Sequence, residues 1–386
     1  MQRRLSLAVS LLSLAGLARE SSSLLYNANG ESAAYTGIGR LRGSRTCTAW
    51  LLDMKPAPPA SAPAYVVTAG HCVGSLTEND ILIDTAAGKM EVTFDYFVDT
   101  PDRRRVVPAE RIAYATMKGA DVAIVQLGAT YEELTKVGLR PLAIGAGARE
   151  GVPVEIVGVP AQGLMTEELF LRKSRCVQGP AVDLLEHMWH WWGMRRNDCL
   201  DLKPGISGSP LLAADTRQVL GVVNTTTEDA FDRGDDIDCS LGVPCETGAA
   251  GPRVIDWAGY SVPIQGLERC FDEGGRFSLE RAGCPLDDNR QVTLRRPGQR
   301  VLRPRVTDES GTLKFSTWQA TLESARFPYY RYKAVAGPPA ACRDAAGYGP
   351  VRSLAQGALI DDPIGEKDGH YSLCVLAGES PVIDSK

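Results

Sequence analysis

The sequence is short of several features, and each shortage excludes a class of protein. After the first 17 residues, no apolar run reaches the roughly 18 residues that a membrane-spanning helix needs. Positive charge is not in excess either, because 42 Lys and Arg stand against 47 Asp and Glu, a formal net charge of −5. The chain therefore lacks the basic surface on which non-specific nucleic-acid binding depends. We expect no transmembrane segment beyond the N-terminus and no nucleic-acid partner.

Histidine is also scarce, with four residues at 71, 187, 190 and 370. None of them stands at a zinc-ligand spacing from a cysteine, and no Cys-x-x-Cys motif occurs. We therefore expect neither a metal site nor a cofactor. If the protein needs a base that works near neutral pH, one of these four side chains must supply it.

The N-terminus has the layout of a targeting segment. Arg3 and Arg4 are followed by the apolar stretch Leu5–Leu17 and then by the small-residue exit that ends at Ala18. This length is typical of a signal peptide and too short to span a bilayer, and a short buried helix fits the charge order poorly. We expect residues 1–18 to be removed and the mature chain to be secreted or periplasmic.

Ten cysteines in an exported chain favour disulfides over metal ligands. An even count grouped along the chain invites pairing between sequence neighbours, although spacing alone leaves other connectivities open. The neighbour pairs are Cys47 with Cys72, Cys176 with Cys199, Cys239 with Cys245, Cys270 with Cys284, and Cys342 with Cys374.

Short apolar runs separated by Gly, Pro and Asp dominate the chain. Runs of four to seven residues rich in Val, Ile and aromatic residues are typical of strands, and many such runs predict a barrel or sandwich rather than a βαβ sheet. Residues 262–271 are compatible with a short closing helix. We divide the chain into a signal peptide (1–18), an N-terminal linker (19–34), a main β domain (35–271), a second linker (272–290) and an accessory β-sandwich-like domain (291–386).

Three motifs carry the residues of a nucleophilic site. His71 directly follows the apolar run 66–69 and precedes a cysteine, Asp121 opens the apolar run 122–127, and Ser207 lies in Gly-Ile-Ser-Gly-Ser-Pro. Each has an ordinary structural explanation: a buried histidine, a strand-start cap and a Gly/Ser/Pro turn. The lipase pattern Gly-x-Ser-x-Gly is excluded because position 209 is serine.

The order His71, Asp121, Ser207 is that of the chymotrypsin-type hydrolases, not of subtilisins or α/β-hydrolases. Together with Cys47-Thr48-Ala49-Trp50-Leu51, it makes residues 35–270 resemble the trypsin/chymotrypsin-like serine peptidases. Gly-x-Ser-Gly-Ser-Pro is similar to their bacterial, glutamyl-endopeptidase-like branch. The resemblance implies an all-β fold, a double β-barrel of chymotrypsin type with the site between the barrels, followed here by the small β-sandwich-like domain.

The resemblance also implies roles for individual residues. Ser207 would be the nucleophile, His71 the general base, and Asp121 the group that fixes the imidazole tautomer. The amides of Gly205 and Ser207 would form the oxyanion hole. The disulfide between Cys47 and Cys72 is habitual in the family.

The specificity pocket is the part where the sequence departs from the family. Asp201 lies six residues before Ser207, where trypsin-like members place a pocket aspartate, but the nearby cysteine is misplaced for that subgroup, and a solvated loop acid is the alternative. Asn224 and Thr226 fall on the expected substrate-pairing strand, where the family often has Ser-Trp-Gly. No histidine supports a glutamate-binding pocket there.

The sequence also departs from the family at the residue that takes part in zymogen activation. In trypsin-like zymogens, a newly freed amine pairs with an aspartate just before the nucleophile, and here that neighbour is Ile206. Burying an ammonium group without a charged partner would cost several kcal/mol of folding free energy. We therefore expect that activity does not depend on a buried, newly freed N-terminal amine.

Three further segments are open to two interpretations each. The aromatic run 187–192 either walls a pocket or packs under a disulfide-closed loop. The acids between 228 and 238 either bind calcium or form a solvated loop. The arginines between 295 and 305 either form a solvated strand face or bind a polyanion.

These observations predict a secreted serine endopeptidase whose partner is a protein or peptide substrate. The alternative is a catalytically inactive peptidase homologue that acts as an extracellular binding module. We also expect the accessory domain to bind an extracellular ligand that the sequence does not identify.

Overall fold

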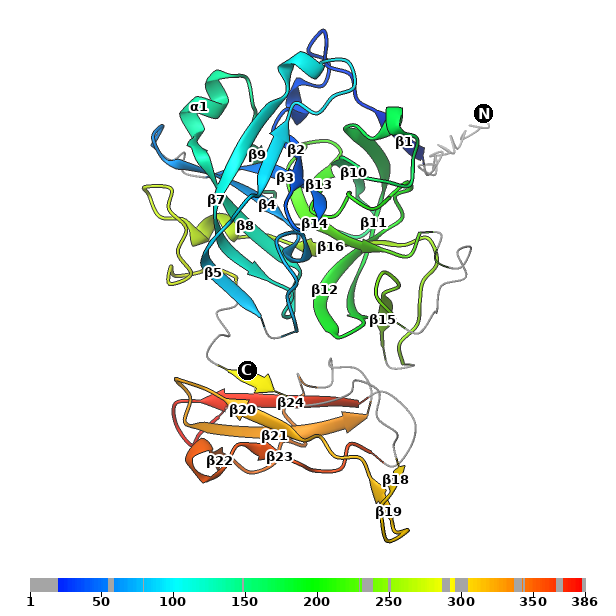
Figure 1. The fold of residues 1–386 in the computed structure, drawn as a ribbon, viewed down its shortest axis with the longest axis vertical. Helices are drawn as coiled ribbons and strands as arrows, with labels where there is room; N and C mark the ends of the chain where they lie inside the picture. The colour runs from blue at the N-terminus through cyan, green and yellow to red at the C-terminus, as the bar shows by residue number, and fades with distance from the viewer. Residues whose placement is uncertain are drawn as a thin grey trace, which may run out of the picture.

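The structure is a computed structural model, and the fold that it shows is almost entirely β (Figure 1). The structure describes residues 20–386 except for 55–58, 79, 148, 229, 231–238, 249–250, 287–291, 296–304, 337–341, 343, 366–370 and 384–386. The expected signal peptide, His370, most of the acidic run and most of the arginine stretch lie outside the described residues.

The first barrel is a sheet that closes on itself, in the order β2-β6-β7-β8-β4-β3 with a further β2–β3 pairing. Its middle strands coincide with the apolar runs that the sequence predicted as strands, and β8 is buried over most of its length. A Thr130–Glu133 capping box starts the one α-helix of the described residues, α1. The bounds are Ile38–Arg42 (β2), Thr46–Asp53 (β3), Pro63–Thr68 (β4), Ile81–Ala86 (β5), Glu91–Phe94 (β6), Arg105–Thr116 (β7), Val122–Thr130 (β8), Tyr131–Lys136 (α1) and Leu142–Ala143 (β9).

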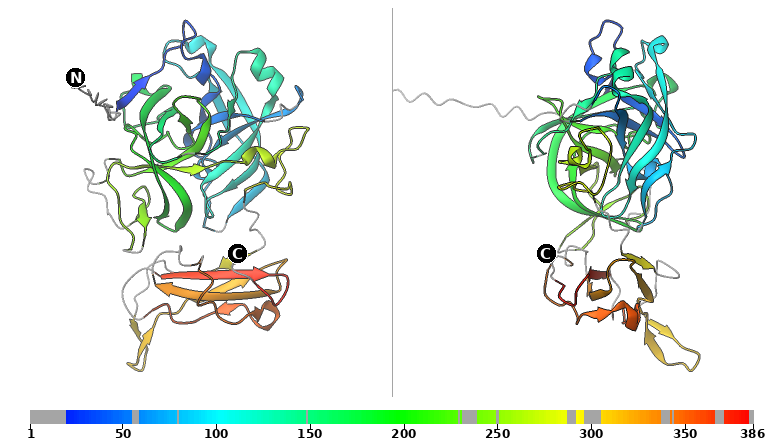
Figure 2. Two further views of the ribbon diagram at one scale, coloured as in Figure 1. Left: turned by 180° about the vertical axis from the view of Figure 1, so that it is seen from behind. Right: turned by 90° about the vertical axis from the view of Figure 1, so that its left-hand side faces the viewer.

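The second barrel closes in the same way, in the order β11-β10-β13-β14-β16-β12 with a further β11–β12 pairing. The two barrels stand side by side, and a single cluster of buried side chains spans both of them (Figures 1 and 2). The bounds are Pro153–Gly158 (β10), Arg172–Glu186 (β11), Trp189–Asn197 (β12), Pro210–Ala213 (β13), Val219–Thr226 (β14), Cys245–Thr247 (β15) and Gly259–Pro263 (β16).

The N-terminal segment is part of the second barrel rather than a loose linker. Residues Glu20–Leu24 form β1, which adds to the sheet beside β11. Tyr35 donates a hydrogen bond to Glu155 Oε2 (2.9 Å), and the side chain of Asn27 is buried. The expectation of a linker over 19–34 was wrong from residue 20 onward, because a short polar strand pairs through its backbone and needs no apolar pattern.

The segment after the second barrel also differs from the prediction. Residues 262–271 do not form an α-helix: β16 ends at Pro263 and a 3-10 turn covers Leu267–Cys270. Gly266, with φ of 83°, interrupts the run just before the turn. Phe277 and Leu286 pack against the main core, so the part of the second linker up to residue 286 is attached to the barrels.

The tail forms two three-stranded sheets, β17-β20-β23 and β22-β21-β24, which share a core around Trp318, Tyr330 and Ile360, and a separate two-stranded sheet, β18-β19. The two sheets on one core make the small β-sandwich that the sequence predicted (Figure 2). The bounds are Thr293–Arg295 (β17), Arg305–Thr307 (β18), Leu313–Phe315 (β19), Ala320–Glu323 (β20), Tyr329–Ala336 (β21), Arg352–Ser353 (β22), Leu359–Ile360 (β23) and Tyr371–Gly378 (β24).

The ten cysteines form five disulfides between sequence neighbours, namely 47–72, 176–199, 239–245, 270–284 and 342–374. Such a set is compatible with an extracellular or periplasmic location. Among the described residues, no helix is long and apolar enough to cross a membrane.

We expect the loss of the Cys47–Cys72 disulfide to lower the free energy of unfolding by about 3 kcal/mol, because the bond closes a loop of 25 residues in the unfolded chain. The measurement is the denaturation midpoint of a Cys47→Ala/Cys72→Ala double variant against the parent protein. Equal midpoints with equal slopes would contradict the prediction.

Candidate active site

A cleft of about 730 Å³ is lined by residues of both barrels. The first barrel contributes the loops around His71, Ser75 and Met117. The second barrel contributes the segment before and around Ser207, the end of β14, and the hairpin that connects β11 to β12. Four of the residues that the sequence singled out line this cleft: His71, Ser207, Asn224 and Thr226.

His71 is held by Asp121 through two contacts. The chain turns into a 3-10 turn at Gly70–Cys72 directly after β4, and Asp121 stands just before β8, which pairs with β4. The ring nitrogen Nδ1 of His71 lies 2.7 Å from Asp121 Oδ2, and the backbone N–H of His71 donates to Oδ1 at 3.0 Å. Asp121 is fully buried, whereas the His71 side chain is 21% exposed. The arrangement fixes Nδ1 toward the carboxylate and leaves Nε2 for the cleft.

The environment of His71 raises its pKa above the usual value. Burial acts in the opposite direction, since it disfavours the charged imidazolium, but the charge of Asp121 and its hydrogen bond outweigh burial. Glu186 adds a smaller effect in the same direction as Asp121. His71 is thus a stronger base than a free imidazole.

The Ser207 loop is shaped by two glycines with positive φ, 104° at Gly205 and 87° at Gly208. A Cβ on Gly208 would collide with the carbonyl of Thr48 and the hydroxyl of Thr68, so only glycine lets the loop approach the first barrel this closely. The Ser207 hydroxyl donates to the carbonyl of Asn224 at 3.1 Å.

Two backbone amides on this loop are available to a ligand. The N–H groups of Ile206, Gly208 and Ser209 donate to backbone carbonyls. Those of Gly205 and Ser207, in contrast, donate to no atom of the described residues. Two unpaired N–H groups, one on the serine itself and one two residues before it, are an arrangement that can stabilise a developing oxyanion.

Thr48 clamps the loop onto the first barrel. Its N–H donates to the carbonyl of Ser207 at 2.9 Å, and its hydroxyl donates to the carbonyl of Gly205 at 2.9 Å. The same hydroxyl accepts from the N–H of Val159, and Thr68 donates to the Thr48 carbonyl at 2.7 Å. The carbonyls of both candidate oxyanion residues are therefore held by one buried residue, Ser207 through the Thr48 backbone N–H and Gly205 through the Thr48 hydroxyl. This role of Thr48 was not predicted from the sequence.

Asn224 and Thr226 contribute differently. The side chain of Asn224 is buried, donates to the backbone carbonyl of Asp121 at 2.6 Å, and accepts from the N–H of Val262 at 2.9 Å. It braces Asp121 across the barrel interface. Thr226 lines the cleft and donates to the carbonyl of Ala258 at 3.1 Å.

Asp201 is not among the residues that line the cleft. Its carboxylate accepts the backbone N–H of Ser22 on β1 at 2.6 Å. The expectation that Asp201 forms the base of a specificity pocket is therefore corrected, because the family's sequence offset does not hold in a loop that is built around a different disulfide.

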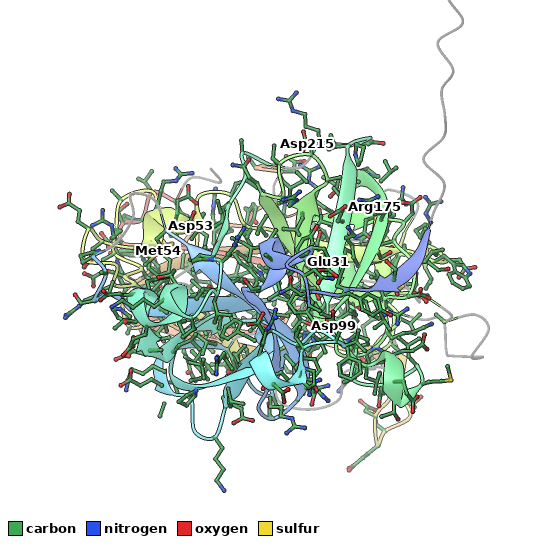
Figure 3. The ribbon with its side chains drawn as sticks, turned by 90° about the horizontal axis from the view of Figure 1, so that it is seen from above. Glu31, Asp53, Met54, Asp99, Arg175 and Asp215 are labelled. Atoms are coloured by element: carbon green, nitrogen blue, oxygen red, sulfur yellow. A yellow bond between two sulfur atoms is a disulfide. The ribbon has the colours of Figure 1, made fainter. Side chains whose placement is uncertain are left out.

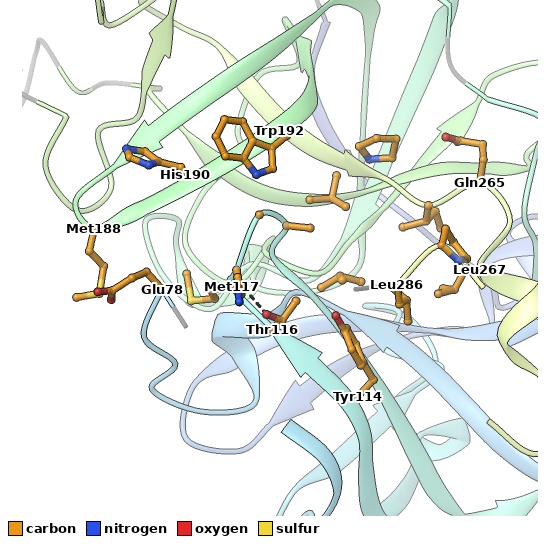
Figure 4. A pocket seen from close by; sticks show the side chains of 18 residues that line it. Glu78, Tyr114, Thr116, Met117, Met188, His190, Trp192, Gln265, Leu267 and Leu286 are labelled. Atoms are coloured by element: carbon orange, nitrogen blue, oxygen red, sulfur yellow. Dashed lines mark hydrogen bonds between the residues drawn. The ribbon is translucent and has the colours of Figure 1, made fainter. Parts of the chain in front are cut away.

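The aromatic run 187–192, which spans the turn after β11 and the start of β12, contacts both barrels. Trp189 Nε1 donates to the carbonyl of Leu76 at 3.2 Å, and Trp191 Nε1 to that of Met117 at 3.0 Å. Both tryptophans line the cleft, so the run forms a pocket wall as well as packing in the interior. A second cavity of about 490 Å³ shares Met117 and Met188 with the cleft and also contacts His190 and Trp192 (Figure 4).

The structure describes only part of the acidic run 228–238 and of the arginine stretch 295–305. Glu228, the first of the acidic run, pairs with Lys203 at 2.7 Å and is part of the cleft wall. The aspartates that follow it lie outside the described residues.

A double β-barrel with this cleft has the architecture of the chymotrypsin-like hydrolases. Residues 47–222 match the family model of the trypsin-like peptidase domain. This part of the chain is therefore similar to a trypsin-like peptidase domain, and the similarity supports a peptidase function. The finer resemblance to glutamyl endopeptidases stays a prediction.

Solved structures with a similar fold include the active form of the Rv3671c protease from M. tuberculosis and the thermostable serine protease AL20 from an extremophilic microorganism. The first is 15% identical, with 61% of this chain and 79% of that chain covered at a TM-score of 0.37. The second is also 15% identical, with 60% and 92% covered at a TM-score of 0.37. No curated protein sequence matches the chain significantly.

Proposed function

We propose that the protein is a secreted serine endopeptidase that hydrolyses peptide bonds through His71, Asp121 and Ser207. The observation that carries the proposal is the His71–Asp121 pair, at 2.7 Å, in the cleft that also holds Ser207 and two unpaired backbone amides. The apolar N-terminus and the five disulfides support secretion.

In the proposed reaction, the Ser207 hydroxyl leaves the Asn224 carbonyl, passes its proton to His71 Nε2 and attacks the carbonyl carbon of the scissile bond. The N–H groups of Gly205 and Ser207 bind the resulting oxyanion. His71 then returns the proton to the leaving amine, which leaves an acyl-enzyme. A water molecule, deprotonated by the same imidazole, releases the acid product and restores Ser207.

A fluorophosphonate probe tests the proposal directly, because it forms a covalent adduct only with an activated serine. We expect one adduct per chain, mapped to Ser207 by peptide mass analysis and blocked by prior heat denaturation. An inactive homologue acting as an extracellular binding module, the alternative function, would leave the protein unlabelled.

We further expect the active loop not to require a freed N-terminus. Ile206 offers no charge to an ammonium, and the Thr48 hydrogen bonds to the carbonyls of Gly205 and Ser207 give the loop local support. Mature protein carrying several different N-terminal extensions ahead of β1 should therefore hydrolyse peptides at similar rates. Activity that appears only after one defined cleavage, and that acetylation of the new amine destroys, would refute this expectation.

A further inference from the structure

A buried carboxylate in the cleft is not used by the chemistry described above. Glu186 is the last residue of β11, lines the same cleft as Ser207, and is 5% exposed. Its Oε1 accepts the backbone N–H of Gly242 at 3.0 Å, on the loop that the Cys239–Cys245 disulfide closes. Its Oε2 has no hydrogen-bond partner among the described residues. The hydroxyl of Thr225 lies beside the carboxylate but makes no well-aligned bond to Oε2.

The other acids near the reaction centre have their partners. Glu228, which also lines the cleft, binds Lys203 Nζ through Oε1 at 2.7 Å and the N–H of Leu202 through Oε2 at 2.6 Å. Asp121 binds His71 through both of its oxygens. Glu186 therefore carries the one carboxylate oxygen, among the described residues that line the cleft, without a hydrogen bond. Burying a carboxylate oxygen that has no hydrogen bond is unfavourable in free energy, and a cationic group of a ligand that binds this oxygen offsets the penalty.

The surroundings of Glu186 suit a long side chain with a charged end. Trp189, Met188 and Leu241 supply apolar surface in the same wall, and Leu241 is 60% exposed. Lysine and arginine lay their methylene stems along such surfaces and reach a carboxylate with the charged group. Asp201, the acid that the sequence offered for this task, is already bound to Ser22.

We propose that Glu186 is a specificity-determining residue, whose free Oε2 binds the cationic end of a lysine or arginine side chain of the substrate. The protein would then select peptides that carry a basic residue close to the scissile bond. The inference rests on the proposed endopeptidase function and identifies its substrate class.

The test is a fluorogenic peptide library in which each of four positions on either side of the scissile bond carries arginine, citrulline, lysine or norleucine. Citrulline keeps the shape of arginine without its charge. At one position we expect kcat/KM to be roughly 10² higher for arginine than for citrulline, since the charged partner alone satisfies the buried carboxylate. Lysine should likewise be preferred to norleucine there.

The Glu186→Gln variant should bring the arginine-to-citrulline ratio of kcat/KM close to one. Glutamine keeps an Oε1 that accepts the Gly242 N–H, so the hairpin is expected to keep its place. Glu155→Gln is the matched control, because Glu155 is a buried glutamate of the same barrel that binds Tyr35 and Arg175 outside the cleft. That variant should keep the parent's ratio.

The ratio should also depend on pH. Burial raises the pKa of Glu186 above its usual value and outweighs the Thr225 hydroxyl, the Gly242 N–H and the charge of His71, which lower this pKa. The charge of Asp121 raises it further. Below this pKa the carboxyl is neutral, so the preference for arginine should be small and should grow as the pH rises through it. The loss of the neutral His71 base at low pH slows the hydrolysis of both peptides alike, so this direct effect on the rate cancels in the ratio.

The two proposals fail differently. A parent protein that hydrolyses none of the peptides and resists the fluorophosphonate overturns the endopeptidase assignment. A parent protein that hydrolyses peptides without preferring a basic residue at any position overturns the role of Glu186. The role is also overturned if Glu186→Gln keeps the full preference, or if the preferred residue at the responsive position is neutral.

Discussion

Replacing Ser207 with alanine should lower kcat/KM for peptide hydrolysis by about 10⁴–10⁶, because the members of such a triad act as a unit and their removal leaves only binding and the oxyanion amides. The fold should survive, since the Ser207 hydroxyl makes one hydrogen bond, to the Asn224 carbonyl. The measurement is steady-state hydrolysis of a fluorogenic peptide, with the denaturation midpoint measured in parallel. The fluorophosphonate adduct should be lost in the same variant.

Ser209→Ala is the matched control for this substitution. Ser209 lies two residues away on the same segment, is fully buried, and has a hydroxyl without a hydrogen-bond partner among the described residues. Removing a buried hydroxyl that lacks a partner costs little, so this variant should keep activity within a few-fold of the parent. Ser207→Ala hydrolysis at the level of Ser209→Ala would overturn the assignment of the nucleophile.

Much of the fold could be predicted from the sequence, because short Val- and Ile-rich runs such as those of β8 and β10 separate cleanly at Gly, Pro and Asp. The predictions failed where structure depends on backbone pairing alone. Residues 20–24 are polar and show no alternation, yet they pair with β11 through main-chain hydrogen bonds. The turn at Leu267–Cys270 looked helical because its apolar spacing does not reveal the left-handed Gly266 that precedes it.

Some residues of the candidate site could be predicted from the sequence and others could not. His71, Asp121 and Ser207 could be selected because each lies in a distinctive short motif and their order is informative. Thr48 and Glu186 could not, because a threonine in an apolar strand and a glutamate at a hairpin end are ordinary residues in a sequence. The positions that the proposals give them depend on tertiary contacts: Thr48 reaches the Ser207 loop from the other barrel, and Glu186 contacts Gly242, 56 residues away in the sequence. Asp201 shows the opposite error. It was predicted as a pocket residue because it lies six residues before Ser207, but its carboxylate binds the Ser22 N–H outside the cleft.

The Asp121→Asn variant should lose about 10⁴ in kcat, and the geometry shows why. The backbone N–H of His71 is a fixed donor at the position of Oδ1, so the amide oxygen of asparagine must take that position. Its NH₂ group then faces Nδ1, where Asp121 Oδ2 lies at 2.7 Å in the parent protein. An NH₂ group there donates to Nδ1 and forces the proton onto Nε2, which leaves the imidazole unable to accept the proton of Ser207.

The same substitution should move the pH profile in a defined direction. In the parent protein, kcat/KM should fall as the pH drops through the raised pKa of His71, because only the neutral imidazole acts as the base. Asparagine removes the charge that raises this pKa, so the acid limb of the residual activity should shift to lower pH. Asp99→Asn is the matched control, since Asp99, labelled in Figure 3, accepts the N–H groups of Asn27 and Ala28 away from the cleft. If Asp121→Asn kept both the parent's rate and its acid limb, Asp121 would have no part in orienting or charging the base, and the imidazole would have to be held by its surroundings alone.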